Sequence, residues 1–213
     1  MTKKLTKKSV PARTIAPLVY PIANTALKPE QLYELPARMP KIDGPWRSEA
    51  GKIAWTDEAT GLGCIILRGR DGALAGYVGV SPAHPLAGFE ADAIAASAGV
   101  GVHGGLTYSR ACDARGPEEL RVCRVRASDA ADLWWLGFAC NLPSDFLPTR
   151  DSANDERGGS KTYRTEGYVF EECTQLAAQL AALTNETGAG VETGVSIDGP
   201  PILLTFSIKR EEK

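Results

Sequence analysis

Two histidines are the first residues in this chain that could do chemistry. His84 lies between prolines in Pro82-Ala83-His84-Pro85, which favours a rigid turn, and His103 precedes two glycines. A zinc site would need both imidazoles plus cysteine or aspartate ligands from other elements. A hydrogen bond from each ring to a nearby backbone group is the simpler interpretation. The glycines leave room around His103, which therefore stays a candidate ligand contact.

A pair of tryptophans offers a second kind of contact. Trp134 and Trp135 lie in a short aromatic run, 133–139, that is typical of a buried strand. Neighbouring residues of a strand point to opposite faces, so one indole is expected in the core and the other across the sheet. The second indole either packs there or gives a nucleobase a platform for stacking. Cys140 has no histidine near it in sequence, which favours a buried thiol over a nucleophile.

The sequence contains none of the strong catalytic signatures. It has no G-x-S-x-G, P-loop, H-E-x-x-H or protein-kinase motif, and the glycine-rich stretch 99–105 lacks dinucleotide-binding spacing. The charged residues Asp145, Arg150, Asp151 and Asp155 are typical of a solvated loop. No catalytic residue, metal ligand or cofactor is therefore assigned from the sequence.

The composition is that of an ordinary folded protein. Of 213 residues, 43% are hydrophobic and 23% are charged, which is enough apolar material for a core. The net charge of −2 lacks the basic surplus of general nucleic-acid binders, and no apolar run reaches the ~20 residues of a membrane span. Five widely spaced cysteines fit reduced thiols better than a disulfide framework. These features predict a cytoplasmic protein without membrane or general nucleic-acid partners.

Residues 1–45 differ from the rest of the chain in their prolines. Seven of the 14 prolines lie there, and each one fixes φ and removes a backbone donor. The stretch is predicted to be a proline-rich arm or tail, with one short helix at 29–35 that starts at Pro29. Lysines before a mildly apolar stretch resemble a signal peptide, but prolines interrupt that stretch.

Residues 46–213 are predicted to form a single α+β domain. A helix at 166–183 carries apolar residues at helical spacing, with Leu176 in the middle of the stripe. An antiparallel sheet with this one main helix of the C-terminal half packed on one face is the expected architecture. An Ala-rich helix at 87–98 is left open. The expected strands are 52–55, 64–68, 74–80, 106–109, 120–125, 133–139 and 202–208.

Several runs in this chain resemble a family of small phage and prophage proteins. They are Gly76-Tyr77-Val78-Gly79-Val80, His84-Pro85, Val102-His103-Gly104-Gly105-Leu106-Thr107-Tyr108-Ser109, the Trp134–Cys140 run and the 163–180 segment. The resemblance covers about residues 50–183. Relatives usually have D-C-A-H where this chain has Ala139-Cys140-Asn141-Leu142, and Arg124 stands where a histidine often follows the cysteine. If those groups form a catalytic or metal site in relatives, this chain lacks it.

The resemblance implies a phage setting, and phages encode many small proteins that blunt host defence. The leading hypothesis is a non-enzymatic accessory protein that binds and sequesters a nucleotide-derived host immune signal. Its ligand would be a small phosphate-bearing nucleotide of the cyclic dinucleotide or cyclic ADP-ribose type. Aromatic side chains would stack on it, and an arginine would pair with phosphate. The candidate contacts are Tyr77, His103, Thr107, Tyr108, Arg110 and Trp135.

Two alternatives from other classes stay open. A hydrolase would cleave a phosphodiester or glycosidic bond in such a signal, with His103 as acid or base. A protein-binding inhibitor of a host defence protein would use residues 1–45, because prolines reduce the entropy lost when an extended segment docks. Assembly into a homo-oligomer is also left open by the sequence.

Overall fold

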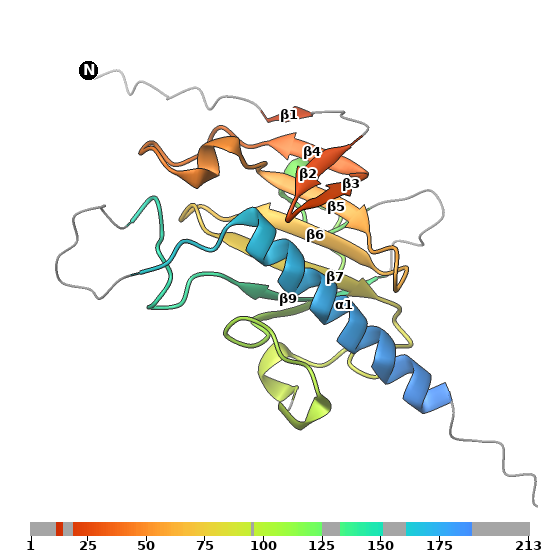
Figure 1. Ribbon diagram of the computed structural model, residues 1–213. Helices are drawn as coiled ribbons and strands as arrows, with labels where there is room; N and C mark the ends of the chain where they lie inside the picture. The colour runs from red at the N-terminus through yellow and green to blue at the C-terminus, as the bar shows by residue number, and fades with distance from the viewer. Residues whose placement is uncertain (1–11, 15–18, 95, 125–132, 151–160, 189–213) are drawn as a thin grey trace, which may run out of the picture.

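The computed structural model describes residues 12–14, 19–94, 96–124, 133–150 and 161–188. In this part of the chain, an antiparallel sheet has seven strands in the order β1-β4-β5-β6-β7-β9-β8. One long helix, α1 (Glu166–Gly188), crosses a face of this sheet and contacts β6 and β7 (Figure 1). The predicted α+β class, with one main helix packed on one face, is confirmed.

The strands of the central sheet follow the apolar runs of the sequence. The described strands are β1 (Arg13–Thr14), β2 (Tyr20–Ile22), β3 (Thr25–Leu27), β4 (Gln31–Glu34), β5 (Lys52–Thr56), β6 (Gly63–Arg68), β7 (Leu74–Val80), β8 (Tyr108–Ala111) and β9 (Trp134–Ala139). Gly72 has a φ of +82° in the turn between β6 and β7, a conformation that glycine adopts without strain. The predictions for β5, β6, β7 and β9 agree with these bounds within a few residues.

The proline-rich arm contributes strands to the structure. The helix predicted at 29–35 is wrong, because these residues include β4, which pairs with β5 in the sheet. The strand is more stable because it buries Leu32 in the core and hydrogen-bonds its backbone to the neighbouring strand. An isolated short helix is unstable in water. β1 adds to the outer side of β4, and β2 and β3 form a separate hairpin.

Three other predictions need comment. The helix left open at 87–98 is replaced by two single 3₁₀ turns, η2 (Ala91–Ala93) and η3 (Ala96–Ala98). No strand forms in the described part of 120–125, where the 3₁₀ turn η4 (Glu118–Leu120) ends. A fourth 3₁₀ turn, η1 (Pro45–Ser48), precedes β5. Short runs of alternating apolar residues form strands only where a neighbouring strand is available. The strand predicted at 202–208 lies outside the described residues.

One cysteine pair corrects the prediction of reduced thiols. Cys112 and Cys123 form a disulfide, with Cα atoms 5.2 Å apart. The chain leaves β8 at Cys112 and returns through η4, which brings the two residues together. The other cysteines, Cys64, Cys140 and Cys173, are free and buried. Wide spacing in sequence therefore says little about which cysteines meet in the fold.

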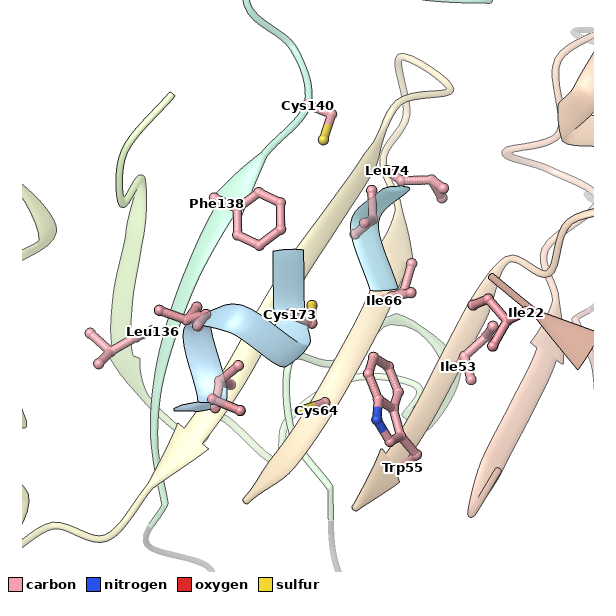
Figure 2. Packing of buried hydrophobic residues seen from close by; sticks show 14 of the residues in the cluster. Ile22, Ile53, Trp55, Cys64, Ile66, Leu74, Leu136, Phe138, Cys140 and Cys173 are labelled. Atoms are coloured by element: carbon pink, nitrogen blue, oxygen red, sulfur yellow. The ribbon is translucent and has the colours of Figure 1, made fainter. Parts of the chain in front are cut away.

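The core lies between the sheet and α1. The helix stripe packs against the side chains that β6, β7 and β9 direct towards it, among them Ile66, Leu74 and Phe138 (Figure 2). A smaller apolar cluster, which includes Ile65 and Trp135, lies on the opposite face of the sheet. Within the described residues, no helix combines the length and apolar character needed to cross a membrane. The fully buried stripe of α1 is Val169, Cys173, Leu176, Ala177 and Leu180.

Gly76 of β7 allows α1 to approach the sheet closely. A Cβ atom at this position would lie 2.6 Å from Cys173 Sγ and 2.6 Å from Phe138 Cζ. We expect Gly76→Ala to lower the free energy of unfolding by about 1–3 kcal/mol, because the helix or the ring must shift. Gly101→Ala is the control, since a Cβ there meets no atom within 4 Å. Urea denaturation measures both, and equal midpoints would contradict this account of the packing.

Candidate ligand-binding site

Four of the six predicted contacts share the sheet face that lies away from α1. Tyr77 and Tyr108 both pair with Gly137 of β9, and their rings meet edge to face with centroids 5.1 Å apart. A Cβ at Gly137 would collide with the Tyr77 ring, so the glycine makes room for this contact. Arg110 is exposed and pairs with Trp135 in register. Directly opposed residues of antiparallel strands project to the same face, which groups these side chains.

The two indoles point to opposite faces, as predicted. Trp134 packs against the α1-facing cluster and donates from Nε1 to Ser109 Oγ at 2.8 Å. Trp135 is 0% exposed and packs with Leu35, Ile65 and other residues of the opposite face. Its Nε1 has no hydrogen-bond partner in the described part of the chain. A ligand that stacks on Trp135 would therefore require this face to open.

His103 lies on the other side of the sheet, against α1. Its Nε2 is 2.7 Å from Asp145 Oδ2, and its Nδ1 is 3.0 Å from the Tyr168 hydroxyl. Its backbone N–H donates to Glu172 Oε2 at 2.7 Å. Burial acts to raise the pKa of Asp145, but hydrogen bonds from His103 and Arg164 outweigh it and hold this pKa below its usual range. Both ring nitrogens of His103 are thus engaged by protein groups.

The predicted contacts are consequently divided between two regions of the described structure. Thr107 is exposed, and its N–H donates to Gly137 O at 2.9 Å beside the start of β8. His84 Nε2 is 3.0 Å from Leu180 O, and His84 Nδ1 accepts a hydrogen bond from the Leu86 N–H. Both ring nitrogens thus contact backbone groups, as the sequence predicted. Among the described residues, no group of three or more His, Cys, Asp or Glu could hold a metal ion.

A cavity of about 590 Å³ lies elsewhere, at the proline-rich arm. We call it the Tyr20 cavity; its size suits a small organic ligand. Its charged lining residues are two cations, Lys41 and Arg47, and two carboxylates, Glu34 and Glu49. The other lining residues are Pro36, Met39, Pro40 and Ala50, which are apolar, together with Tyr20 and Ser48.

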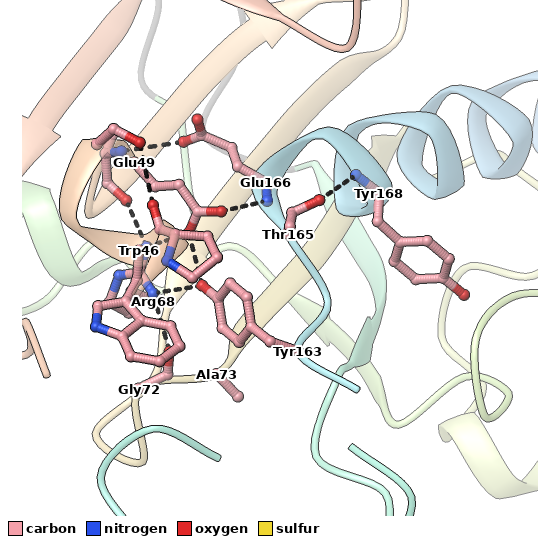
Figure 3. Close-up of polar contacts among 12 residues, drawn as sticks. Trp46, Glu49, Arg68, Gly72, Ala73, Tyr163, Thr165, Glu166 and Tyr168 are labelled. Carbon is pink, nitrogen blue, oxygen red and sulfur yellow. Dashed lines mark hydrogen bonds and ion pairs between the residues drawn. The ribbon is translucent and has the colours of Figure 1, made fainter. Parts of the chain in front are cut away.

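Glu49 lines this cavity and also belongs to a network of hydrogen bonds and ion pairs between partly buried side chains (Figure 3). The Glu49 carboxylate accepts hydrogen bonds from Arg68 Nη2 at 2.8 Å and from the Tyr163 hydroxyl at 2.6 Å. It also accepts the backbone N–H of Glu166 at 2.9 Å, one of the first N–H groups of α1 that lack partners within the helix. Glu49 therefore ties the cavity wall to β6 and to the start of α1.

Glu166 supplies a second buried carboxyl group to this network. Its Oε2 accepts the Tyr20 hydroxyl at 2.8 Å, and its Oε1 accepts the Ala50 N–H at 3.1 Å. Burial raises the pKa of Glu166 to about 7, and the nearby charge of Glu49 adds to this rise. Burial, with the charge of Glu166, also raises the pKa of Tyr20 above its usual value. Glu166 therefore changes protonation state near neutral pH, while Tyr20 keeps its proton.

A second cavity, also of about 590 Å³, has a different charge. Its charged lining residues are Glu30, Asp57, Glu58 and Lys28, so carboxylates outnumber cations. An anionic ligand would meet repulsion there, whereas the Tyr20 cavity offers it two cations. The Tyr20 cavity is therefore the better candidate for a phosphate-bearing ligand.

Sequence reasoning missed the residues of the Tyr20 cavity, because most of them fall in or beside the arm. One signal was present in the sequence: Trp46 lies between Pro45 and Arg47 in a polar stretch. In the structure Trp46 is buried, and its ring centroid is 5.0 Å from that of Tyr163 and 5.9 Å from that of Phe146. A large aromatic residue in a proline-rich stretch indicates that the stretch packs on the core.

Comparisons with known proteins do not place this chain in a family. No family model matches it, and neither a curated protein nor a solved structure matches it. The candidate site therefore depends on the geometry and charge of the Tyr20 cavity.

Proposed function

We propose that this protein binds and sequesters a small phosphate-bearing nucleotide without cleaving it, and that the Tyr20 cavity holds this ligand. The supporting observation is a cavity of about 590 Å³ whose lining includes both apolar side chains and two cations, Lys41 and Arg47. A nucleobase would pack against Tyr20 and Met39, and phosphate oxygens would pair with Lys41 and Arg47. The ligand that we propose is a host immune signal, a cyclic dinucleotide or a cyclic ADP-ribose isomer, in keeping with the phage setting that the resemblance implies.

Arg47 is well placed to exchange its carboxylate partner for a phosphate, while its Nη2 also donates to Lys41 O at 2.9 Å. Its Nη2 is 3.1 Å from Asp43 Oδ1, but the Asp43 side chain is 98% exposed and that of Arg47 is 51% exposed. Exposed ion pairs of this kind contribute only about 0–1 kcal/mol. A guanidinium also matches a phosphate with two parallel hydrogen bonds. Breaking the Arg47–Asp43 ion pair would therefore cost little free energy, and the new pair between Arg47 and a ligand phosphate would be stronger.

The titratable side chains that a hydrolase would use are engaged in protein contacts. Both nitrogens of His103 have protein partners, so a water molecule finds no free nitrogen on that ring. Both oxygens of Glu166 accept hydrogen bonds, and the residue is buried. General acid–base catalysis needs such a group within reach of the reacting atom. These contacts favour binding over turnover.

Calorimetry with a panel of cyclic dinucleotides and cyclic ADP-ribose isomers tests the proposal. We expect one of them to bind, and the double variant Lys41→Ala/Arg47→Ala to weaken that binding about 100-fold, because two charge-assisted contacts are lost. Arg115→Ala is the matched control. Arg115 is likewise an exposed arginine paired with a nearby aspartate, Asp113, but it lies outside the lining of the cavity.

Two further measurements separate this proposal from its rivals. Arg110→Ala should leave affinity unchanged; a large loss would move the site to the face that carries Tyr77 and Tyr108. Bound ligand released by heat denaturation should be intact, whereas a cleaved product would indicate a hydrolase. No heat with any member of the panel at roughly 100 µM protein would contradict ligand binding altogether.

A further inference from the structure

The Tyr20 hydroxyl links the wall of the cavity to the buried carboxyl of Glu166. We infer that Tyr20 donates a hydrogen bond to the bound ligand only when Glu166 is protonated, so that proton uptake at this site tightens ligand binding. The inference rests on the proposed function, because it takes the Tyr20 cavity as the ligand site. Tyr20 is then a ligand contact, and Glu166 is a positioning residue that acts through it.

The hydrogen-bond geometry around Tyr20 allows two arrangements. The Tyr20 oxygen lies 2.8 Å from Glu166 Oε2 and 3.2 Å from the Ala50 nitrogen. An ionised Glu166 has no proton to give, so the Tyr20 hydroxyl must donate to it. A protonated Glu166 can donate to the Tyr20 oxygen instead, since a hydroxyl both donates and accepts. The hydrogen of Tyr20 is then free to turn towards the cavity that Tyr20 lines.

Burial and the neighbouring charges explain why Glu166 takes up a proton so readily. Tyr20 on β2, Glu49 before β5 and Arg68 on β6 are the titratable groups that act on it. The cation of this network, Arg68, is already paired with the Glu49 carboxylate at 2.8 Å. Ionisation of Glu166 would therefore add a second negative charge beside a cation that already has a partner. Burial is the largest cause of the raised pKa of about 7, and Glu49 acts in the same direction.

The direction of the pH effect follows from this raised pKa. The ordinary value is 4.5, so the folded protein holds the Glu166 proton more tightly than the unfolded chain does. The stabilisation is complete below about pH 4.5 and is lost as the pH rises towards about 7. In the folded protein Glu166 stays protonated up to about pH 7, so the Tyr20 donor is free below that pH, and a ligand with an acceptor oxygen should bind more tightly there.

The test uses 3′,3′-cyclic di-AMP, whose phosphodiester charge is constant near neutral pH. We expect the wild-type protein to bind it about tenfold more tightly at about pH 6 than at about pH 8.5, the size of one additional hydrogen bond. Glu166→Gln should bind tightly at both values, because its neutral amide donates to the Tyr20 oxygen. Tyr20→Phe should bind weakly at both values, because the donor is gone.

Thermal melting without ligand gives an independent readout. Between about pH 5 and about pH 7.5 the melting temperature of the wild-type protein should fall by roughly 5 °C more than that of Glu166→Gln. Equal affinity of the wild-type protein at both pH values, or a pH dependence that persists in Glu166→Gln, overturns the inference and leaves the proposed function standing. No binding of the probe at either pH overturns the inference as well, whereas the proposed function fails only when no member of the panel binds.

Discussion

Arg68→Met should lower the free energy of unfolding by about 3–5 kcal/mol, the usual result of removing one partner from a buried ion pair. Arg68 is 0% exposed and contacts Glu49 Oε2 at 2.8 Å, the Tyr163 hydroxyl at 2.9 Å and Gly72 O at 2.9 Å. Methionine fills much of the same volume but leaves the Glu49 carboxylate buried without its cation. Urea denaturation near neutral pH measures the loss.

Two companion variants show whether the uncompensated charge is the cause. Arg115→Met removes an arginine whose side chain is 91% exposed, and it should change stability by less than about 0.5 kcal/mol. The double variant Arg68→Met/Glu49→Gln should cost less than the sum of the two single variants, because no unpaired buried charge remains. Additive costs would show that Arg68 and Glu49 are not energetically coupled.

Leu176→Ala should cost about 2–5 kcal/mol, the range found for truncating a buried leucine. Leu176 is 0% exposed and sits in the middle of the α1 stripe that covers β6 and β7. The loss would be a large share of the ~5–15 kcal/mol that stabilise a typical domain. Gln175→Ala, at the exposed neighbouring position, should change stability by less than about 0.5 kcal/mol. Small and equal effects of the two changes would mean that α1 does not close the core.

The central strands, the main helix and the two faces of the tryptophan pair could be predicted from the sequence. The run 64–68 predicts β6, and the spacing of Val169, Cys173 and Leu176 predicts α1. These signals are local, because strand and helix periods of about 2 and 3.6 residues are set by neighbouring backbone dihedrals. The opposite placement of Trp134 and Trp135 follows from the same strand period.

The polar network and the cavity were decided only by the tertiary structure. Tyr163 and Glu49 are 114 residues apart in sequence, and Glu49 and the Glu166 N–H are 117 apart, yet both pairs are hydrogen-bonded. Such contacts depend on the order of strands in the sheet and on where α1 begins, and no short pattern encodes either. The same holds for β4: its residues have no strong local preference, and pairing with β5 made them a strand. The sequence determined which segments are regular, and the packing of distant segments determined which charges meet.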